Sequence, residues 1–365
     1  MRVMVVVPGA LGYGGTTRFL ERLLEIHARQ GIVTTLLMPE QASAATAALS
    51  GHSGVEILFA PDRTGPETAP FLTPFFDLLF SWRAIWSRRP DLIVVSTSDP
   101  GRMSIALYLP FPVLYFLHGA PERPFRLLPR IYMRIGSFLN NRVVTVSRAA
   151  AQSIAATMGL PADHISVVYN STPAVQLGPE GGAPVVVTAG HLVPYKNPFG
   201  WLEVAKNVLQ KRGDATFVWL GDGELLAAMR EMVNSAGLQE RILLPGYVPD
   251  LLPWLTAAQV YFQPSLRESH GIAVLEAMAH RLPCVVADTG GLPESVVDDE
   301  TGFVCRPGDL AGFTDRILDL LDDRPLRVRL GSAGRLSVEG KFSPAQQEQK
   351  LLALYGSLVR KADLR

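Results

Sequence analysis

Short apolar runs alternate with longer segments of helical periodicity along most of the chain. The apolar runs are rich in Val and Ile, whereas the longer segments repeat apolar residues three and four positions apart. This alternation is typical of parallel sheets covered by helices, and it predicts an α/β fold. In the first half it predicts strands near residues 2–7, 32–38, 55–59, 91–95, 112–117, 142–146 and 165–168, and helices over 16–30, 74–89 and 124–138.

A stretch rich in Pro and Gly then interrupts the alternation, which starts again after residue 184. The second half predicts strands near 185–189, 215–220, 241–244, 260–263, 284–287 and 303–304, helices near 198–211, 223–236, 271–280 and 309–322, and only helices thereafter. We therefore expect two Rossmann-like doubly wound domains that face a central cleft, with ligands at the carboxyl ends of the strands. The expected boundaries are 1–175 for the first domain, 176–184 for a linker, 185–342 for the second domain, and 343–365 for a helix packing back toward the first.

Composition and charge narrow the class of protein. Of the 365 residues, 48% are hydrophobic and 19% charged, which excludes a disordered or collagen-like chain. The 34 basic and 34 acidic residues cancel, whereas a general nucleic-acid binder normally carries a basic excess. Two cysteines cannot form a disulfide framework and fit a reducing compartment. The longest apolar run, residues 107–117, is too short to span a bilayer, so a cytoplasmic location is expected.

Basic charge is concentrated between residues 81 and 148, where ten Arg accompany three acidic residues. Within this segment Arg126, Arg130 and Arg134 recur every four residues, so on a helix they form one basic stripe beside an apolar face. One interpretation is peripheral contact with the anionic inner face of a membrane. The other is an ordinary helix that covers the sheet and exposes a charged edge, which is the interpretation favoured for residues 71–89.

Two loops that contain glycine follow strands and precede helices. In the first, Gly14 and Gly15 end a glycine-rich turn, where the backbone can approach an anion closely at a helix N-terminus. An ordinary tight turn would use glycine in the same way, and the spacing is not the dinucleotide-binding G-x-G-x-x-G. In the second, His191 and Lys196 share one loop, so their side chains can converge on an anion. A solvated lysine on a turn is the alternative.

The strongest motif is the loop and helix that follow the fourth strand of the second half. The loop carries Glu268, and the helix is expected to start near Gly271, so that the backbone N–H groups of Gly271, Ile272 and Ala273 suit a phosphate. Glu276 lies in an otherwise apolar run, so its carboxylate needs donors such as sugar or ribose hydroxyls. The alternatives are a salt bridge to a neighbouring helix for Glu276 and a solvated loop acid for Glu268.

As a set, these motifs resemble those of the GT-B-fold retaining glycosyltransferases of family 4, the glycosyl transferases group 1. Glu268 and Glu276 are spaced as that family's E-x7-E pair, and Lys196 ends a Gly-x-Leu-Val-Pro-x-Lys loop. The other matching segments are Gly221-Asp222-Gly223, Asp288-Thr289-Gly290-Gly291-Leu292-Pro293-Glu294, Thr301-Gly302-Phe303 and, more loosely, Gly14-Gly15, His118-Gly119 and Val168-Tyr169-Asn170. The resemblance covers essentially the whole chain.

The resemblance implies an enzyme that transfers a sugar from a UDP- or GDP-sugar to a hydroxyl group, with retention of anomeric configuration. The implied acceptor is a glycan, a lipid-linked sugar or a polysaccharide of the cell envelope. Lys196 would contact the donor diphosphate, Glu268 the hydroxyls of the donor sugar, and Glu276 the ribose hydroxyls. The resemblance thus implies His118, Lys196 and Glu268 as catalytic residues, and Gly14, Gly15, Tyr247 and Val248 as further donor-site positions. Of these, the two glycines would approach the diphosphate, the histidine the reacting carbon, and the last two the base.

His191 departs from the pattern, because the family usually has Arg there. An imidazole has at most two donors and is only partly charged at neutral pH, so donor binding is expected to be weaker or pH-sensitive. The sequence has no Asp-x-Asp at a strand end and no His/Asp cluster with ligand spacing, which favours a metal-independent reaction without a further cofactor. The alternatives left open are a non-hydrolysing sugar-nucleotide epimerase, a phosphorylase, a catalytically silent nucleotide-sugar-binding protein and, less favoured, a nicotinamide dehydrogenase.

Overall fold

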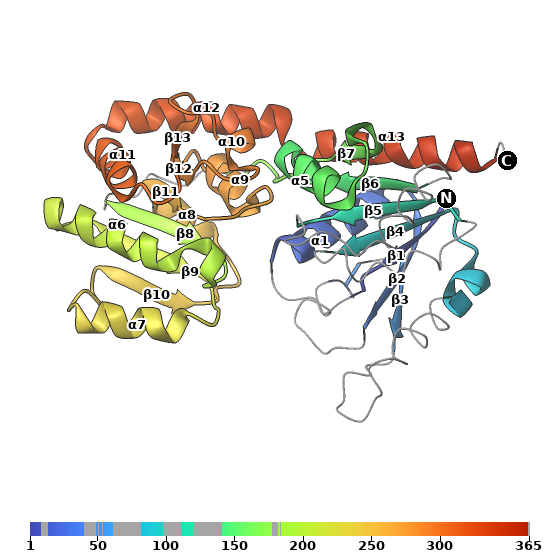
Figure 1. Cartoon of the computed structure of the whole chain (residues 1–365), viewed down its shortest axis with the longest axis horizontal. Coiled ribbons are helices and arrows are strands. Elements are labelled where there is room, and N and C mark those ends of the chain that lie inside the picture. Colours follow the sequence, from blue (N-terminus) through green and yellow to red (C-terminus); the bar gives the residue numbers. More distant parts are fainter. Residues whose placement is uncertain are drawn as a thin grey trace. The chain divides into compact units, whose positions relative to one another are not determined.

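The chain divides into two compact units, each built on one parallel β-sheet. The structure, a computed structural model, describes residues 1–8, 14–39, 49, 51–52, 54–60, 82–97, 111–119, 141–176, 182 and 184–363. The first unit combines Met1–Tyr169 with Gln347–Arg365, and the second is Asn170–Gln346. Figure 1 shows the two sheets and their helices. The structure therefore has the α/β architecture that the alternation predicts.

In the first unit, the described strands form a seven-stranded parallel sheet in the order β3-β2-β1-β4-β5-β6-β7. The strands are β1 (Arg2–Val6), β2 (Val33–Pro39), β3 (Val55–Ala60), β4 (Leu92–Thr97), β5 (Val113–Leu117), β6 (Asn141–Thr145) and β7 (Ile165–Val167). The helices are α1 (Gly15–Arg29), a helix over 82–88, α5 (Arg148–Met158), η3 (Ala162–His164) and α13 (Pro344–Asp363). The order reverses direction beside β1, as in a doubly wound fold.

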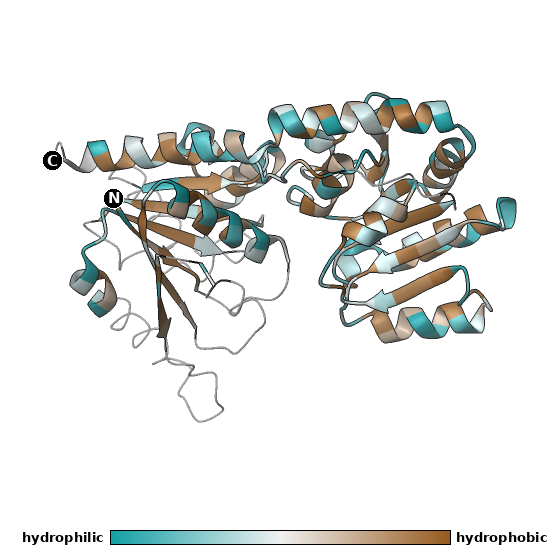
Figure 2. Ribbon diagram, turned by 180° about the vertical axis from the view of Figure 1, so that it is seen from behind, coloured by the Kyte–Doolittle hydropathy of each residue, from teal (hydrophilic) through white to brown (hydrophobic). Residues whose placement is uncertain are grey.

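Both faces of this sheet are buried, as expected for a parallel sheet with helices on each side. Alternate side chains of β1 belong to two hydrophobic cores, one on each face of the sheet. Val3 and Val5 pack with α1 and α13, whereas Met4 and Val6 pack with α5 and the helix over 82–88. Figure 2 shows the hydrophobic strands beneath helices that present hydrophilic residues outward. The predicted helix at 124–138, with Arg126, Arg130 and Arg134, lies outside the described residues.

The C-terminal helix α13 belongs to the core of the first unit. A buried hydrogen-bond network joins it to the sheet: His27 Nδ1 lies 2.9 Å from Thr34 Oγ1, and His27 Nε2 lies 3.0 Å from the hydroxyl of Tyr355. Burial lowers the pKa of His27 to about 4, so the imidazole is neutral near pH 7. This network connects residues from opposite ends of the chain.

In the second unit, the strands form a six-stranded parallel sheet in the order β10-β9-β8-β11-β12-β13. The strands are β8 (Val185–Ala189), β9 (Thr216–Leu220), β10 (Ile242–Gly246), β11 (Val260–Gln263), β12 (Cys284–Ala287) and β13 (Gly302–Cys305). The helices are η4 (Pro194–Lys196), α6 (Pro198–Lys211), α7 (Leu226–Ser235), α8 (Leu252–Ala257), α9 (Ile272–Ala279), α10 (Leu292–Ser295), α11 (Leu310–Asp322) and α12 (Arg324–Lys341). Here the order reverses between β8 and β11.

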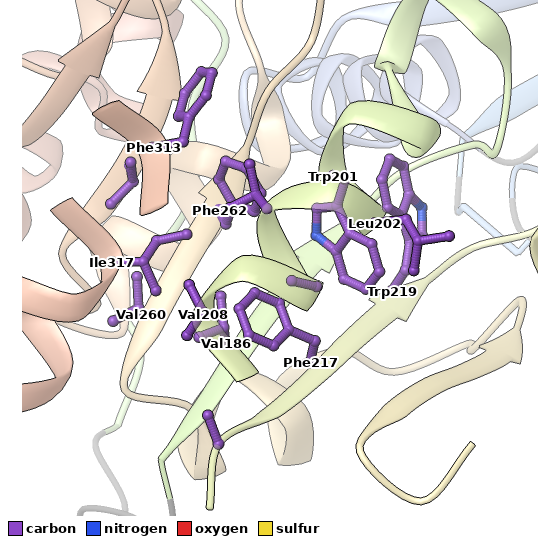
Figure 3. Close-up of a cluster of buried hydrophobic side chains, with 14 of the residues drawn as sticks. Val186, Trp201, Leu202, Val208, Phe217, Trp219, Val260, Phe262, Phe313 and Ile317 are labelled. Carbon is purple, nitrogen blue, oxygen red and sulfur yellow. The ribbon is translucent and has the colours of Figure 1, made fainter. Parts of the chain in front are cut away.

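Aromatic side chains lie among the aliphatic residues in the core of the second unit (Figure 3). Trp201 of α6 packs against Phe217 and Trp219 of β9, with ring centroids 5.7 and 5.3 Å apart. Both indoles are also hydrogen-bonded, since Trp201 Nε1 donates to Thr188 Oγ1 at 2.7 Å and Trp219 Nε1 donates to the carbonyl of Gly190 at 2.8 Å. The second bond ties this core to the loop that follows β8.

Where the predicted helices fall on described residues, their bounds agree closely with the structure, and only residues 82–88 of the helix predicted at 74–89 are described. The sequence predicts a helix from residue 223, whereas α7 begins at Leu226. Residues 221–223 form an irregular loop and 224–225 a turn, in which the N–H of Leu225 donates to the carbonyl of Leu192 at 3.1 Å. Both cysteines are buried and free, and burial raises the pKa of Cys305 to about 11.

Candidate active site

The candidate site lies at the carboxyl ends of the central strands of the second unit. Strands β8 and β11 are neighbours where the strand order reverses, which is where open α/β sheets bind ligands. The loop after β8 carries His191 and Lys196, and the loop after β11 carries Glu268. Sequence positions more than 70 residues apart therefore meet at one edge of the sheet.

Lys196 and Glu268 form an ion pair between these two loops. The ammonium group of Lys196 donates a hydrogen bond to Oε2 of Glu268, and only 15% and 13% of the two side chains are exposed. The charges therefore lie in a partly desolvated place, where they interact more strongly than at the surface. An ammonium group has three donors, so Lys196 can contact an anion while it stays bound to Glu268.

Hydrogen bonds between the backbones of the two loops hold this ion pair in place. The N–H of Leu266 donates to the carbonyl of Tyr195 at 2.8 Å. Asn197 caps α6, since its Oδ1 accepts from the N–H of Gly200 at 3.2 Å, while its Nδ2 donates to the carbonyl of Pro264 at 3.2 Å. The loop after β11 is therefore attached to the start of α6 as well as to the residue before Lys196.

The Asp-Thr-Gly-Gly turn supports Glu268 from the other side. The N–H of Gly291 donates to the carbonyl of Glu268 at 3.1 Å, and Thr289 Oγ1 donates to the carbonyl of Leu266 at 3.0 Å. Gly290 has a left-handed φ of 54°, and a Cβ at this position would lie 1.7 Å from the carbonyl oxygen of Glu268. Glycine is required here for both reasons, which explains why this turn belongs to the motif.

Close packing also shapes the loop that carries Lys196. A Cβ on Gly221 would lie 2.0 Å from the carbonyl oxygen of Gly190, so the turn after β9 sits directly against this loop. The side chain of Lys196 folds back over Gly190, whose Cβ position is 3.9 Å from Nζ. His191, in contrast, is exposed to solvent.

Helix α9 starts beside Glu268. Gly271 is its N-cap residue, with a left-handed φ of 82°, and the half-buried Ile272 and Ala273 form its first turn. The first amides of an α-helix have no partner inside the helix and favour an anion. Glu276, one turn further along, is half-buried.

Two further buried side chains, which the sequence analysis did not select, lie behind Glu268. Gln263 Nε2 donates to Oε2 of Glu268 at 2.7 Å, and Gln263 Oε1 lies 2.9 Å from the hydroxyl of Tyr261. Burial, with a smaller contribution from charges that include Glu268 and Glu276, raises the pKa of Tyr261 well above its ordinary value. The sequence feature that could have pointed to Gln263 is a polar side chain at the end of a strand that is otherwise apolar.

Tyr247 and Val248 follow β10 at the same edge of the sheet. The carbonyl of Gly246 accepts a hydrogen bond from the N–H of Gly221 at 2.9 Å, which joins the end of β10 to the turn after β9. Tyr247 is 45% exposed and Val248 is half-buried.

The first unit holds the remaining candidate residues. His118 follows β5, and its Nε2 lies 2.9 Å from Ser96 Oγ. Its ring packs against Phe19 and Phe116, with centroids 4.7 and 4.9 Å away, and burial lowers the pKa of His118 to about 3. Gly14 caps α1, and Gly15 is the first residue of that helix.

Sequence profiles of two families match adjoining halves of the chain. The profile described as "Glycosyl transferases group 1" matches residues 174–337, which include the ion pair and α9. The profile described as "Glycosyltransferase Family 4" matches residues 13–174. The chain belongs to the group 1 glycosyltransferases. This membership agrees with the resemblance found in the sequence, and the range matched by the group 1 profile includes the edge of the second sheet where the ion pair lies.

Individual relatives support the same family and fold. The chain is 31% identical over 186 residues to the UDP-Gal:alpha-D-GlcNAc-diphosphoundecaprenol alpha-1,3-galactosyltransferase of Escherichia coli, covering 50% of this chain and 48% of that protein. For this relative and three others, the match to this chain covers less than half of the relative's own length.

Solved structures match over nearly the full length. A glycosyltransferase from Rickettsia africae has a TM-score of 0.83 at 17% identity, covering 98% of this chain and 99% of that one. Alr3699/HepE from Anabaena, solved with UDP and glucose, has a TM-score of 0.78 at 17% identity, covering 97% and 99%. These likenesses show that the fold is GT-B.

Proposed function

We propose that this glycosyltransferase transfers a sugar from a nucleoside-diphosphate sugar to a hydroxyl of a glycan, lipid-linked or polysaccharide acceptor, with retention of anomeric configuration and without a metal ion. The observation that carries the proposal is the Lys196–Glu268 ion pair beside the N-terminus of α9. It places a cation, a carboxylate and helix N–H groups at one edge of the sheet. A nucleotide sugar offers the complementary anion and hydroxyls.

These groups can stabilise the charge that develops during the proposed reaction. When the bond between the sugar carbon and the phosphate oxygen breaks, negative charge develops on the diphosphate, and Lys196 with the amides of Ile272 and Ala273 would stabilise it. The acceptor oxygen forms the new bond to the sugar carbon, and the leaving phosphate takes the acceptor's proton. No protein nucleophile is needed for this attack on the same face of the sugar.

The remaining residues take supporting roles in the proposal. Glu268 would accept hydrogen bonds from hydroxyls of the donor sugar, and Glu276 from those of the ribose. His118, with its lowered pKa, would act near the sugar as a neutral imidazole. His191 would add a donor at the diphosphate.

The proposed donor and acceptor classes rest on relatives. The Anabaena protein was solved with UDP and glucose, which favours a UDP-sugar here, with a GDP-sugar as the alternative. The name of the Escherichia coli relative describes transfer to a sugar on diphosphoundecaprenol, which favours a lipid-linked acceptor in the synthesis of an envelope glycan. Metal independence is proposed because Lys196 and the helix amides can supply the positive charge themselves.

A panel of UDP-, GDP- and ADP-sugars tests this function. Ligands that raise the melting temperature would then be incubated with the enzyme in buffer with EDTA, and released nucleotide and product anomer would be followed by NMR. Hydrolysis or transfer with retention supports the proposal. An epimerised donor would instead indicate a sugar-nucleotide epimerase, and binding without any turnover a catalytically silent binding protein.

We include in the proposal a peripheral contact of the first unit with an anionic membrane at its cytoplasmic face. The helix over 82–88 lies in the segment for which the sequence favoured an ordinary covering helix, but it exposes 49% of Trp82 and 44% of Trp86, whose rings lie 5.7 Å apart. Arg83 and, just after the helix, Arg89 are exposed as well. Tryptophan favours the membrane interface, and each basic residue near an anionic surface contributes about 1 kcal/mol. No helix among the described residues is long and apolar enough to cross a membrane.

Sedimentation with vesicles of varied anionic content tests the membrane contact. We expect salt-sensitive binding that is weakened in a Trp82→Ala/Trp86→Ala variant and in an Arg126→Ala/Arg130→Ala/Arg134→Ala variant. Absence of binding to anionic vesicles at low salt would exclude the contact and favour a soluble acceptor. Unchanged binding by only one variant would remove that segment from the contact.

A further inference from the structure

A row of buried hydrogen bonds runs from the sheet of the second unit to the candidate sugar-binding carboxylate. The N–H of Ala189 lies 3.3 Å from the hydroxyl of Tyr261, which lies 2.9 Å from Oε1 of Gln263. Gln263 Nε2 lies 2.7 Å from Oε2 of Glu268, which also accepts from Lys196. Tyr261 and Gln263 are 0% and 2% exposed. The row therefore connects β8 and β11 through buried groups to the partly exposed ion pair.

The chemistry of the groups fixes the direction of each bond. An ionised carboxylate only accepts, so the amide of Gln263 must turn its NH2 toward Glu268 and its oxygen toward Tyr261. The amide oxygen only accepts, so in this bond the hydroxyl of Tyr261 donates, although the carbonyl of Ala189, 3.2 Å from the same hydroxyl, is a second acceptor for its proton. That hydroxyl can then accept from the N–H of Ala189. The NH2 group of Gln263 and the ammonium group of Lys196 thus both donate to Glu268.

Two donors occupy the same oxygen of Glu268. Lys196 and Gln263 both bind Oε2, while no hydrogen bond to Oε1 occurs within the part of the chain that the structure describes. A carboxylate held in this way cannot rotate without breaking a buried hydrogen bond from Gln263. Oε1 is then the oxygen that remains to accept from a ligand.

Packing alone does not account for Gln263. The other residues of β11 are Val260, Tyr261 and Phe262. An apolar residue in place of Gln263 would continue this pattern and avoid the cost of burying an amide group. A buried amide is stable only because both of its ends are hydrogen-bonded. The amide of Gln263 therefore serves to position Glu268 rather than to fill the core.

We propose that Gln263, supported by Tyr261, is the positioning residue that selects the oxygen of Glu268 which meets the hydroxyls of the donor sugar. This inference rests on the proposed function, because it takes Glu268 to be the residue that contacts the sugar. It predicts that Gln263 affects the sugar part of the donor and not the nucleotide part.

The test compares Gln263→Met, which keeps the length of the side chain but cannot donate, with the parent enzyme. We expect kcat/KM for the nucleotide sugar to fall about 10- to 100-fold, the effect of losing one hydrogen bond to a charged group. Binding of the free nucleoside diphosphate should change less than about two-fold. Phe262→Leu, on the same strand, is the control for loosened packing, and it should lower the melting temperature while kcat/KM stays within about two-fold.

Gln263→Glu provides a readout that a purely structural role would not move. At high pH the carboxylate introduced at position 263 repels that of Glu268, so activity should be lost. As the pH falls, the new carboxyl group becomes protonated and can donate as the amide does, so activity relative to the parent enzyme should rise. Tyr261→Phe should show a smaller loss than Gln263→Met, because the amide keeps its bond to Glu268.

Three results would overturn the inference. One is an unchanged kcat/KM in Gln263→Met, and another is an equal loss of free-nucleotide binding and of turnover. The third is a pH profile of Gln263→Glu parallel to that of the parent enzyme. Glu268→Gln separates this inference from the proposed function: if Glu268→Gln is fully active, both are wrong. If it is inactive while Gln263→Met is normal, only the positioning role is wrong.

Discussion

Gly290→Ala should destabilise the second unit by more than the cost of placing alanine in a left-handed backbone conformation. Its left-handed φ of 54° costs a residue with a Cβ about 1–2 kcal/mol. The new Cβ would also lie 1.7 Å from the carbonyl oxygen of Glu268, so the backbone of one loop must move. Overpacking of this kind costs about 1–3 kcal/mol, which gives a total of about 2–5 kcal/mol.

Gly237→Ala is the matched control in the same unit. Its φ is 68°, but nothing lies within 4 Å of its Cβ position. The control should lose about 1–2 kcal/mol from backbone strain and keep its turnover. Urea unfolding followed by fluorescence measures the stability of this unit, because Trp201 and Trp219 are buried in its core.

Activity provides the second half of this test. Movement of the loop displaces Glu268, and a misplacement of about 1 Å can cost about 100-fold in rate. We therefore expect Gly290→Ala to lose transfer at temperatures where it is still folded, with Gly237→Ala close to the parent enzyme. Equal stability and equal turnover of the two variants would refute the argument that this turn supports Glu268.

Three further predictions concern charge and pH. Lys196→Ala should fold normally but lower kcat about 100- to 1,000-fold, the scale for one lost donor to developing charge. Lys206→Ala, which removes only the ion pair of the half-buried Lys206 with Glu203 on α6, should keep its activity in the same assay. Glu276→Gln should weaken binding of the free nucleotide in calorimetry, while Glu268→Gln should spare it and reduce transfer; identical losses would show that these roles are misassigned. Because the pKa of His27 is lowered to about 4, His27 takes up a proton in the unfolded chain at a higher pH than in the folded one. Its own contribution to stability should therefore fall by about 3 kcal/mol as the pH drops from about 6.5 to about 4, and urea unfolding of His27→Gln should lack this part of the slope.

Local pattern was sufficient for most elements of the fold. Helix α6 runs from Pro198 to Lys211 as predicted, because an apolar period follows an Asn-Pro start that suits a capped first turn. The strands of both sheets were visible as Val- and Ile-rich runs, since both faces of a parallel sheet are buried. The spacing of Glu268 and Glu276 placed one in a loop and the other on a helix, and the structure has them so.

Tertiary structure decided which of these residues meet. The contact between Lys196 and Glu268 depends on β8 and β11 being neighbours, and strand order is set by crossover connections rather than by the sequence within a strand. The role of Gln263 was hidden for the same reason, because only the folded loop brings the carboxylate to its amide. His27 and Tyr355 lie 328 positions apart, and their hydrogen bond exists only because α13 returns to the first sheet. Sequence patterns report on short-range periodicity, whereas these contacts depend on how the chain closes long loops in space.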